Sequence, residues 1–186
     1  MPRSPSEQPE GLRLQPELLT VDEQGRLLDV LRQLRFDPIL MRGRAARRTA
    51  RHYGVGYDYE TRTPRPGEPL PEWLLPVRER AAELAGEKPE ALAEVLVQRY
   101  PEGATIGWHR DAPAFGTVVG VSLGGACRLR FQRGKRERRR VWEVRLDPRS
   151  GYVLSGEARR SWEHSIPATK ELRYSVTFRT LRRSVQ

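Results

Sequence analysis

The sequence has only one cysteine and three histidines among its 186 residues. The single Cys127 excludes an internal disulfide bond and any metal site built from several cysteines, so a bound metal ion would need histidine and carboxylate ligands. No run of eighteen apolar residues is present, and the first residues, MPRSPSEQPEG, are polar and rich in proline. We therefore expect neither a transmembrane helix nor a secretory signal peptide, and we predict a cytoplasmic protein with no membrane partner.

Apolar residues make up a modest 37% of the chain, but four tryptophans and six tyrosines add large apolar surfaces. A chain of this length can bury one sizeable core. We expect a disordered tail over residues 1–11 and a single domain over residues 12–186. No internal repeat marks a further domain, and no obligate protein partner is evident.

Basic residues outnumber acidic ones by 34 to 24, which gives a formal net charge of +10. Much of the excess lies in two clusters, residues 41–53 (MRGRAARRTARHY) and residues 130–142 (RFQRGKRERRRVW). Gly134 and the dense charge around it are typical of the tip of a β-hairpin. Arginine clusters bind phosphate backbones through counterion release, although a solvated basic surface would show the same pattern. The charge therefore indicates a polyanionic partner without identifying it.

Helical patterns lie in the first half of the chain. Thr20 and Glu23 have the spacing of a capping box, and the leucines that follow repeat on one helical face. A second helix is expected in residues 72–85, where Pro76 indicates a short first turn or a kink. The Pro- and Gly-rich residues 61–71 before it predict a loop.

Strand-like patterns dominate from Val95 onward. Short β-branched and aromatic runs are separated there by glycine, proline and charged residues. This pattern is typical of an all-β barrel or of a double-sheet jelly roll. The expected strands lie in residues 94–100, 116–124, 127–133, 140–146, 151–156 and 173–179.

A candidate metal site centres on His109 and Asp111 in the stretch GWHRDAPAFG. His164 is the histidine available as a third ligand, because His52 lies inside the first arginine cluster. Two histidines and one carboxylate on one face of a metal ion leave positions for a cosubstrate and O₂, as in non-haem Fe(II) oxygenases. A polar turn in which Asp111 only caps a backbone amide is the alternative.

The last expected strand, RYSVTFR, has two chemically different faces. Apolar and polar side chains alternate, so one face would pack against the core while the other carries two hydroxyls and two arginines, Arg173 and Arg179. Arginines repeated on one face favour an anion such as a dicarboxylate. A solvated strand face is the alternative.

Four segments together resemble a known family: QRYPEGATIGWHRD, GVSLGGACRLRF, PRSGYVLSGEARRSWEHSIP and RYSVTFRTLR. In order and spacing they resemble the AlkB family of Fe(II)- and 2-oxoglutarate-dependent dioxygenases, over about residues 14–182. The resemblance implies a mainly β fold with N-terminal helices: a double-stranded β-helix (jelly-roll) core with an N-terminal substrate-recognition lid, roughly residues 41–70. It also implies O₂ as a substrate and Fe(II) bound by His109, Asp111 and His164.

The resemblance extends to the 2-oxoglutarate site. Arg173 resembles the arginine that grips the distal carboxylate, a role that suits a planar guanidinium. Six residues of extended strand span about 20 Å, so Arg179 would meet the same molecule only if the strand bends, or would act through its neighbours. Tyr100 matches the family's tyrosine near this site, and Gln98 stands where related enzymes often carry asparagine. Ordinary strand packing is the alternative for both.

The activity that the resemblance implies is oxidative dealkylation of N-alkylated nucleobases, which yields succinate, CO₂ and formaldehyde. A damaged base must leave the stack to reach a buried metal ion, and it then needs aromatic and basic contacts. The lid segment RRTARHYGVGYDYETR offers both, although its tyrosines could simply pack the lid onto the core. The candidate substrate contacts are Arg48, Arg51, Tyr53, Tyr57 and Tyr59.

The residues after Asp111 depart from the pattern of well-known DNA-repairing members. Those enzymes often carry further acidic residues there that meet the exocyclic amine of the base, whereas this chain continues with Ala112, Pro113 and Ala114. We expect alkylated DNA as the substrate, with RNA (including tRNA) or protein as alternatives. A metal-free nucleic-acid-binding module is a further alternative, but it would leave the triad and the strand arginines without a role.

Overall fold

The computed structural model describes residues 7–41, 43–58, 63–134 and 139–182. The helical segments are α1 (Val21–Gln33), η1 (Glu72–Leu74), α2 (Leu75–Ala85), η2 (Pro89–Ala91) and α3 (Gly156–Arg160). The strands are β1 (Leu12–Gln15), β2 (Asp37–Met41), β3 (Arg44–Asp58), β4 (Thr63–Pro66), β5 (Leu92–Tyr100), β6 (Ile106–His109), β7 (Phe115–Gly124), β8 (Cys127–Arg133), β9 (Arg140–Leu146), β10 (Gly151–Leu154), β11 (Glu163–Ile166) and β12 (Arg173–Leu181).

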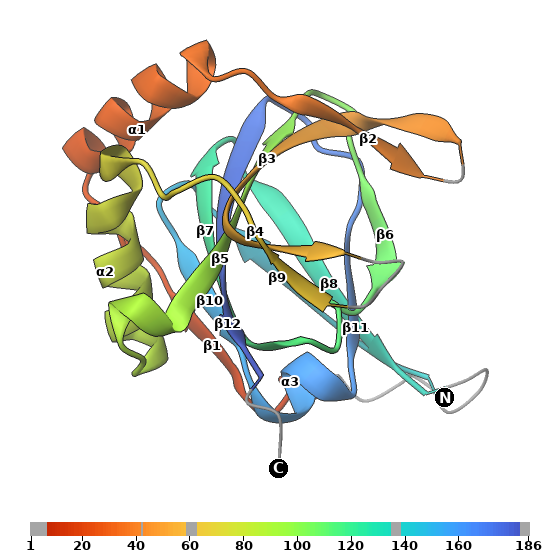
Figure 1. The fold of residues 1–186 in the computed structure, drawn as a ribbon. Helices are drawn as coiled ribbons and strands as arrows, with labels where there is room; N and C mark the ends of the chain where they lie inside the picture. The colour runs from red at the N-terminus through yellow and green to blue at the C-terminus, as the bar shows by residue number, and fades with distance from the viewer. Residues whose placement is uncertain (1–6, 42, 59–62, 135–138, 183–186) are drawn as a thin grey trace.

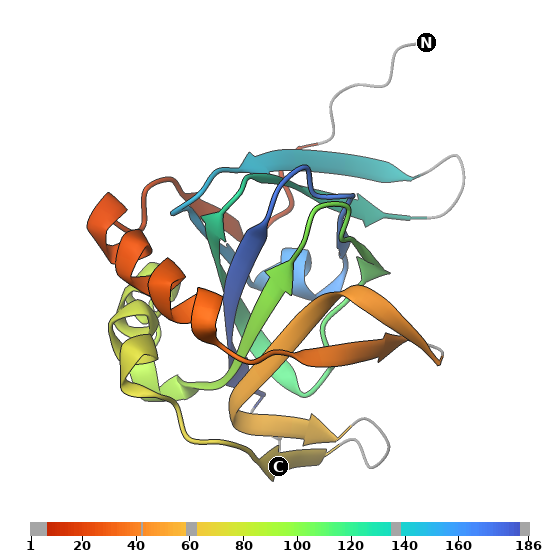
Figure 2. The same ribbon diagram turned by 90° about the horizontal axis from the view of Figure 1, so that it is seen from above.

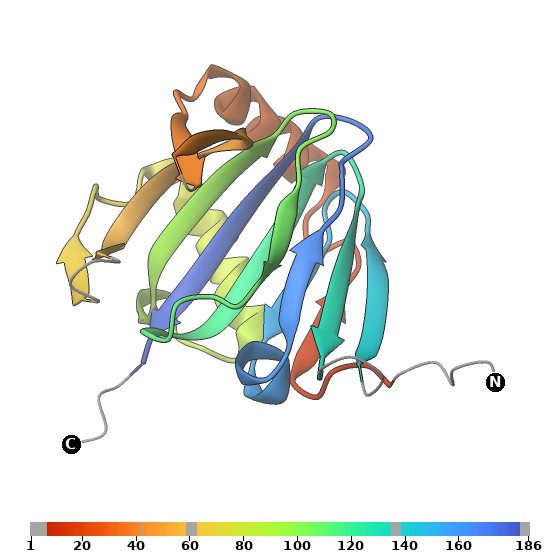
Figure 3. The ribbon, with the colours of Figure 1, turned by 90° about the vertical axis from the view of Figure 1, so that its right-hand side faces the viewer.

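The strands form two antiparallel sheets (Figure 1). The large sheet has the order β1-β10-β7-β12-β5-β3-β2, with β4 paired to β3, and the small sheet has the order β6-β11-β8-β9. Figure 3 shows the strands of both sheets from the side. This mainly β, double-sheet architecture confirms the jelly-roll prediction, and β12 lies in the middle of the large sheet between β5 and β7.

The two predicted helices cover one face of the large sheet (Figure 2). The capping box of α1 is formed: the Thr20 hydroxyl accepts from the Glu23 N–H at 3.1 Å, and the Glu23 carboxylate accepts from the Thr20 N–H at 2.7 Å. Leu27 and Leu31 are buried on the inner side of this helix. Pro76 lies in the first turn of α2, directly after η1, so it starts this helix and does not kink it. None of the described helices is long and apolar enough to cross a membrane.

Two hydrophobic clusters hold the layers together. One lies between the helices and the large sheet and includes Val97, Val176 and Phe178, while the other lies between the two sheets and includes Leu129 and Phe131. Because successive strand residues point to opposite faces, the polar side chains of β12 are turned away from the helices and toward the small sheet. The fold therefore places a row of polar groups inside the molecule, and the solvated-face alternative for β12 is wrong.

Several elements were not expected from the sequence. β3 runs through the first arginine cluster, and β6 and β11 are only four residues long, which is too short for a clear alternation pattern. The predicted β8–β9 hairpin is present, with Arg133 paired to Arg140, and residues 135–138 lie outside the described part. Glu10 and Gly11 accept hydrogen bonds from the backbone N–H groups of Ala158 and Ser155, so the predicted disordered tail does not extend to Gly11.

Candidate metal and cosubstrate site

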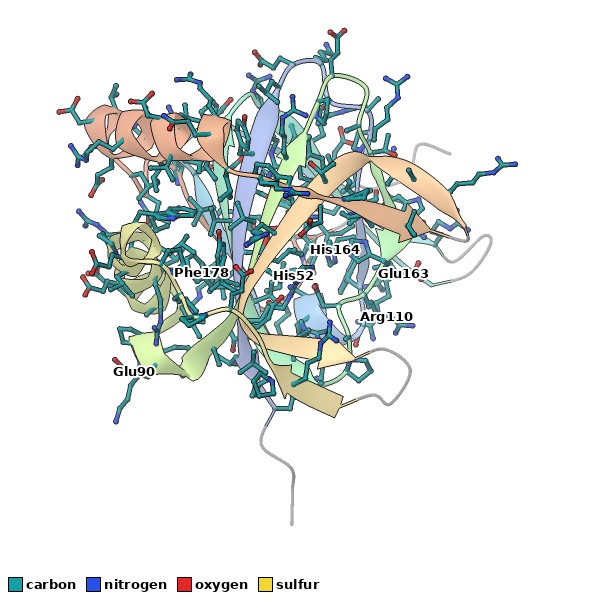
Figure 4. The ribbon with its side chains drawn as sticks, turned by 45° about the horizontal axis from the view of Figure 1, so that its top comes forward. His52, Glu90, Arg110, Glu163, His164 and Phe178 are labelled. Carbon is teal, nitrogen blue, oxygen red and sulfur yellow. The ribbon has the colours of Figure 1, made fainter. Side chains whose placement is uncertain are left out.

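A cavity of about 1760 Å³ lies between the two sheets. Alternate residues of β5 and β12 form one wall, and β6, β11 and the chain that follows His109 form another. In Figure 4, Arg110, Glu163 and His164, which line the cavity, lie on one side of the large sheet, whereas Phe178 lies toward the helices. Further lining residues come from β2 and β3: Ile39, Leu40, Arg48, Ala50 and His52.

The pairing of β6 with β11 places His109 directly opposite His164. The centroids of the two imidazole rings are 4.2 Å apart. Asp111 lies two residues beyond the end of β6, and its Oδ2 is 3.6 Å from His164 Nε2. One ligand atom from each of the three residues lies within 4.8 Å of the other two, so the predicted triad can hold a metal ion. The polar-turn alternative does not account for this convergence.

The hydrogen bonds around the triad leave its ligand atoms available. Asp111 Oδ2 is buried and has no hydrogen-bond partner among the described residues. A buried carboxylate oxygen without a partner is costly, which fits a cation bound at that atom. His109 Nδ1 lies 2.9 Å from the Gly107 carbonyl oxygen, and an N–H that donates there leaves Nε2 free to bind the metal ion.

The protonation states of the triad also suit a metal ion. Burial lowers the pKa of His164 to about 3, although the neighbouring Asp111 carboxylate acts in the opposite direction. At neutral pH this imidazole is therefore uncharged, as a metal ligand must be. Burial would raise the pKa of Asp111, but Arg179 and then the two histidines lower it well below its usual value, so its carboxylate is ionised.

Arg179 joins Asp111 to a second buried carboxylate. Its Nε and Nη2 donate to Asp111 Oδ1 at 2.9 and 2.7 Å, and its Nη1 donates to both carboxylate oxygens of Glu94 at 3.0 and 2.8 Å. Burial would lower the pKa of Arg179, but the carboxylates of Glu94 and Asp111 raise it. The guanidinium therefore stays charged and fixes one oxygen of Asp111 while the other, Oδ2, faces His164.

The opposite end of the polar face of β12 holds a fully buried Arg173. Its Nε donates to Ser122 Oγ at 3.0 Å, while its two terminal nitrogens have no hydrogen-bond partner among the described residues. The Tyr100 ring centroid is 5.0 Å from the Arg173 guanidinium carbon, and the Tyr100 hydroxyl donates to Gln98 Oε1 at 3.0 Å. Two adjacent guanidinium nitrogens without a partner fit a carboxylate that binds in bidentate fashion.

The structure does not bring the predicted substrate contacts together. Arg48 is buried and lines the cavity. Arg51 lies on the other face of β3, where it pairs with Glu68 at 2.6 Å, and Tyr53 packs edge-on against Trp73 in the helix-side core. The two-residue alternation of β3 explains the separation, because residues 48 and 52 face the cavity while residues 51 and 53 face away.

The remaining two predicted contacts lie at the end of the lid segment. The backbone of Tyr57 belongs to β3 and pairs with Pro64 of β4, but its side chain is outside the described part of the structure. Tyr59 lies wholly outside the described residues. A stacking role for either tyrosine stays a prediction.

Sequence reasoning missed three residues of the cavity region. Glu94 shares the face of β5 that carries Gln98 and Tyr100, and an acidic residue within the otherwise apolar stretch 92–97 was the available signal. Tyr152 crosses Gly120 so closely that a Cβ at Gly120 would lie 2.2 Å from its ring. The third, Arg159, is buried beside the loop that follows Asp111, and no local pattern marks it.

We predict that Glu94→Ala destabilises the fold because it leaves the Arg179 charge buried with only one carboxylate. Removing one partner of a buried ion pair typically costs about 3–5 kcal/mol of unfolding free energy. Glu94→Gln keeps the shape and two polar groups, so we expect a smaller loss. Urea unfolding at neutral pH measures both, and an unfolding free energy for Glu94→Ala within about 1 kcal/mol of wild type would contradict the prediction.

A family model described as the 2OG-Fe(II) oxygenase superfamily matches residues 11–179. An Arabidopsis thaliana protein named alkylated DNA repair protein ALKBH8 homolog is 30% identical in a match that covers 86% of this chain and 51% of that protein. A Mus musculus protein named tRNA (carboxymethyluridine(34)-5-O)-methyltransferase ALKBH8 is 28% identical in a match that covers 87% of this chain and 25% of that protein. The chain thus spans about half the length of the first relative and a quarter of the second.

Solved structures show the same fold at lower identity. The structure of OsALKBH1 superposes with a TM-score of 0.70 at 18% identity and covers 94% of this chain and 98% of that chain. A Burkholderia pseudomallei oxidoreductase of the 2OG-Fe(II) oxygenase family gives a TM-score of 0.63 at 16% identity, covering 93% of this chain and 86% of that chain. These two likenesses concern the fold alone.

Proposed function

Because this chain belongs to the 2OG-Fe(II) oxygenase superfamily, is of the AlkB type and uses Fe(II), 2-oxoglutarate and O₂, we propose that its substrate is an alkylated base in a nucleic acid. Bound iron supplies the site at which O₂ is activated and 2-oxoglutarate is converted to succinate and CO₂ while a substrate C–H bond is oxidised. Where the oxidised carbon is a methyl group on a ring nitrogen, the hydroxymethyl product releases formaldehyde and the base is restored.

The residues that carry this proposal stand along one cavity. His109, Asp111 and His164 hold the iron, and Arg179 fixes the orientation of Asp111. Arg173 receives the distal carboxylate of 2-oxoglutarate on its two nitrogens that lack a partner, beside Tyr100 and Gln98. The single observation that supports this assignment most is that one cavity holds both a carboxylate oxygen without a hydrogen-bond partner, close to two histidines, and a guanidinium whose two terminal nitrogens have no partner among the described residues.

Charge supports nucleic acid as the macromolecule. The chain carries a formal net charge of +10, and several arginines line the cavity or lie on the β8–β9 hairpin. The triad is largely buried, so a base has to leave its stack to reach it. The proposed lid is roughly residues 41–70, and its strand β3 contributes Arg48 and His52 to the cavity lining.

DNA repair is the proposed biological role, and tRNA modification is the second candidate. The name of the Arabidopsis relative refers to alkylated DNA repair, whereas that of the mouse relative refers to a tRNA uridine. The absence of acidic residues directly after Asp111 favours the second candidate. The deciding experiment incubates the protein with Fe(II), 2-oxoglutarate and methylated DNA and RNA oligonucleotides, and reads loss of the methyl group by mass spectrometry. Succinate formation without change or binding of any oligonucleotide would favour a protein substrate instead.

We predict that single-stranded oligonucleotide binding depends steeply on salt. In a plot of the logarithm of the binding constant against the logarithm of the salt concentration, each phosphate that the protein neutralises on a single strand contributes about 0.7 to the slope. Replacing Arg139 and Arg140 with Gln should therefore make the slope shallower by about 0.7 for each phosphate contact that is lost. Arg32 is the control, because it is exposed, pairs with Asp29 and belongs to α1, which packs on the face of the large sheet opposite the cavity. Affinities at four salt concentrations measure the slopes. A slope of zero for the wild type would reject nucleic acid as the partner.

A further inference from the structure

The wall of the cavity carries far more positive than negative charge. Among the described residues that line it, seven are arginines and only two, Asp111 and Glu163, are carboxylates. A bound Fe(II) ion and a bound 2-oxoglutarate dianion carry opposite charges of equal size, so they leave this excess unchanged. The seven arginines are Arg48, Arg110, Arg159, Arg160, Arg173, Arg179 and Arg182, of which Arg179 is compensated by the buried Glu94 as well as by Asp111.

One of these carboxylates is committed to the metal site, and the other is hydrogen-bonded to a neighbouring strand. Asp111 belongs to the metal triad, and its other oxygen already accepts from Arg179. Glu163 precedes the inward-facing His164 on β11, and its carboxylate accepts a hydrogen bond from Gln132 of β8 at 2.7 Å. The chain after Asp111 lines the cavity without adding any charge, because residues 112–114 are Ala-Pro-Ala.

Arg159 supplies a positive charge that phosphate groups of a nucleic acid cannot readily neutralise. It is buried, and it donates to the carbonyl oxygens of Ala112, Phe115 and Gly116 at 2.7, 2.8 and 3.0 Å. No carboxylate is among its hydrogen-bond partners in the described residues. By contrast, exposed arginines such as Arg110 are accessible to phosphates.

Alkylated bases differ in charge in a way that this wall can distinguish. A methyl group on N1 of adenine or N3 of cytosine leaves a cationic base, whereas a methyl group on N1 of guanine or N3 of uracil leaves a neutral one. A cationic base next to buried guanidinium groups meets like-charge repulsion that water screens poorly. We propose that this site selects uncharged alkylated bases and disfavours cationic ones, an inference that rests on the proposed function.

Four single-stranded oligonucleotides of one sequence test this selection. Each carries one modified base: 1-methyladenine, 1-methylguanine, 3-methylcytosine or 3-methyluracil. We expect kcat/KM for each neutral base to exceed that for its cationic counterpart of similar shape by about tenfold or more, and we expect the same order in anaerobic affinities measured with Mn(II) in place of Fe(II). Equal or faster turnover of the cationic bases would overturn the selection by charge while leaving the proposed function intact. Absence of both turnover and binding for all four would overturn the proposed function itself.

A matched pair of variants separates charge from shape. Ala114 lines the cavity and lies three residues beyond Asp111. Ala114→Glu adds a carboxylate to this wall, and we expect it to shift the ratio of cationic to neutral turnover by about tenfold toward the cationic bases. Ala114→Gln has the same size without the charge, so its ratio should equal that of the wild type. If Ala114→Glu left the ratio unchanged, or if both variants changed it equally, charge would not be the selecting property.

Discussion

Replacing Asp111 with alanine should reduce iron-dependent succinate formation by more than about 100-fold, because changes at residues that only orient metal ligands already cost 10–100-fold. The carboxylate supplies the buried Oδ2 that lies 3.6 Å from His164 Nε2 and lacks a hydrogen-bond partner. Without it, two histidines alone would have to hold the ion. Succinate release and Mn(II) affinity, measured on the same preparation, report the two consequences separately.

The control for this prediction has to account for Arg179. Asp111→Ala also removes one of the two carboxylates that pair with this buried guanidinium, so the variant should lose stability as well. His109→Ala removes a ligand without touching Arg179, and it should cause a similar loss of activity with a smaller change in unfolding free energy. Full iron-dependent activity of either variant would reject the triad.

Replacing Arg173 with methionine should raise the 2-oxoglutarate concentration needed for half-maximal activity by about 30- to 100-fold or more. Truncating one partner of a buried, hydrogen-bonded charge pair costs about 2–5 kcal/mol, and each 1.4 kcal/mol corresponds to a tenfold change. Methionine keeps most of the side-chain volume, so the cavity should not collapse. Affinity for 2-oxoglutarate in the presence of Mn(II) without O₂ gives a reading that does not depend on turnover.

The matching Arg179 variant should behave differently. Arg179 is engaged by Asp111 and Glu94, so Arg179→Met should weaken metal binding more than it weakens 2-oxoglutarate binding at saturating metal. Arg173→Lys should recover part of the cosubstrate affinity, because it restores the charge without the bidentate geometry. Equal effects of the Arg173 and Arg179 variants on cosubstrate affinity would show that both arginines meet the cosubstrate.

Features that depend on neighbouring residues were readable from the sequence. The capping box at Thr20 and Glu23 forms because both hydrogen bonds span three residues. The apolar and polar faces of β12 follow from the two-residue repeat of any strand, so Arg173 and Arg179 had to share a side. The mainly β class and the β8–β9 hairpin were predictable for the same reason, whereas the candidate triad was predicted from the small number of histidines and from the resemblance.

Features that depend on strand pairing were decided by the tertiary structure. Tyr53 and Arg51 seemed equivalent to Arg48 because no strand was expected in this segment; once β3 pairs with β5, its two-residue alternation turns Arg48 toward the cavity and the other two away. Whether Arg179 reaches the cosubstrate or acts through neighbours could not be settled locally, because its partners Asp111 and Glu94 lie 68 and 85 positions away in the chain. DNA as the substrate and a cytoplasmic location stay predictions.

The sequence by itself determined which residue types were available and on which side of a strand each would lie, since alternation and capping are short-range. The tertiary structure decided which of them meet. The pairing of β6 with β11 sets His109 opposite His164, and the packing of the two sheets buries the polar face of β12 against them. Burial lowers the pKa of His164, so that its imidazole is neutral, and it removes Arg173 from solvent. Both effects need the tertiary structure, because a side chain loses its water only when strands distant in the sequence pack around it.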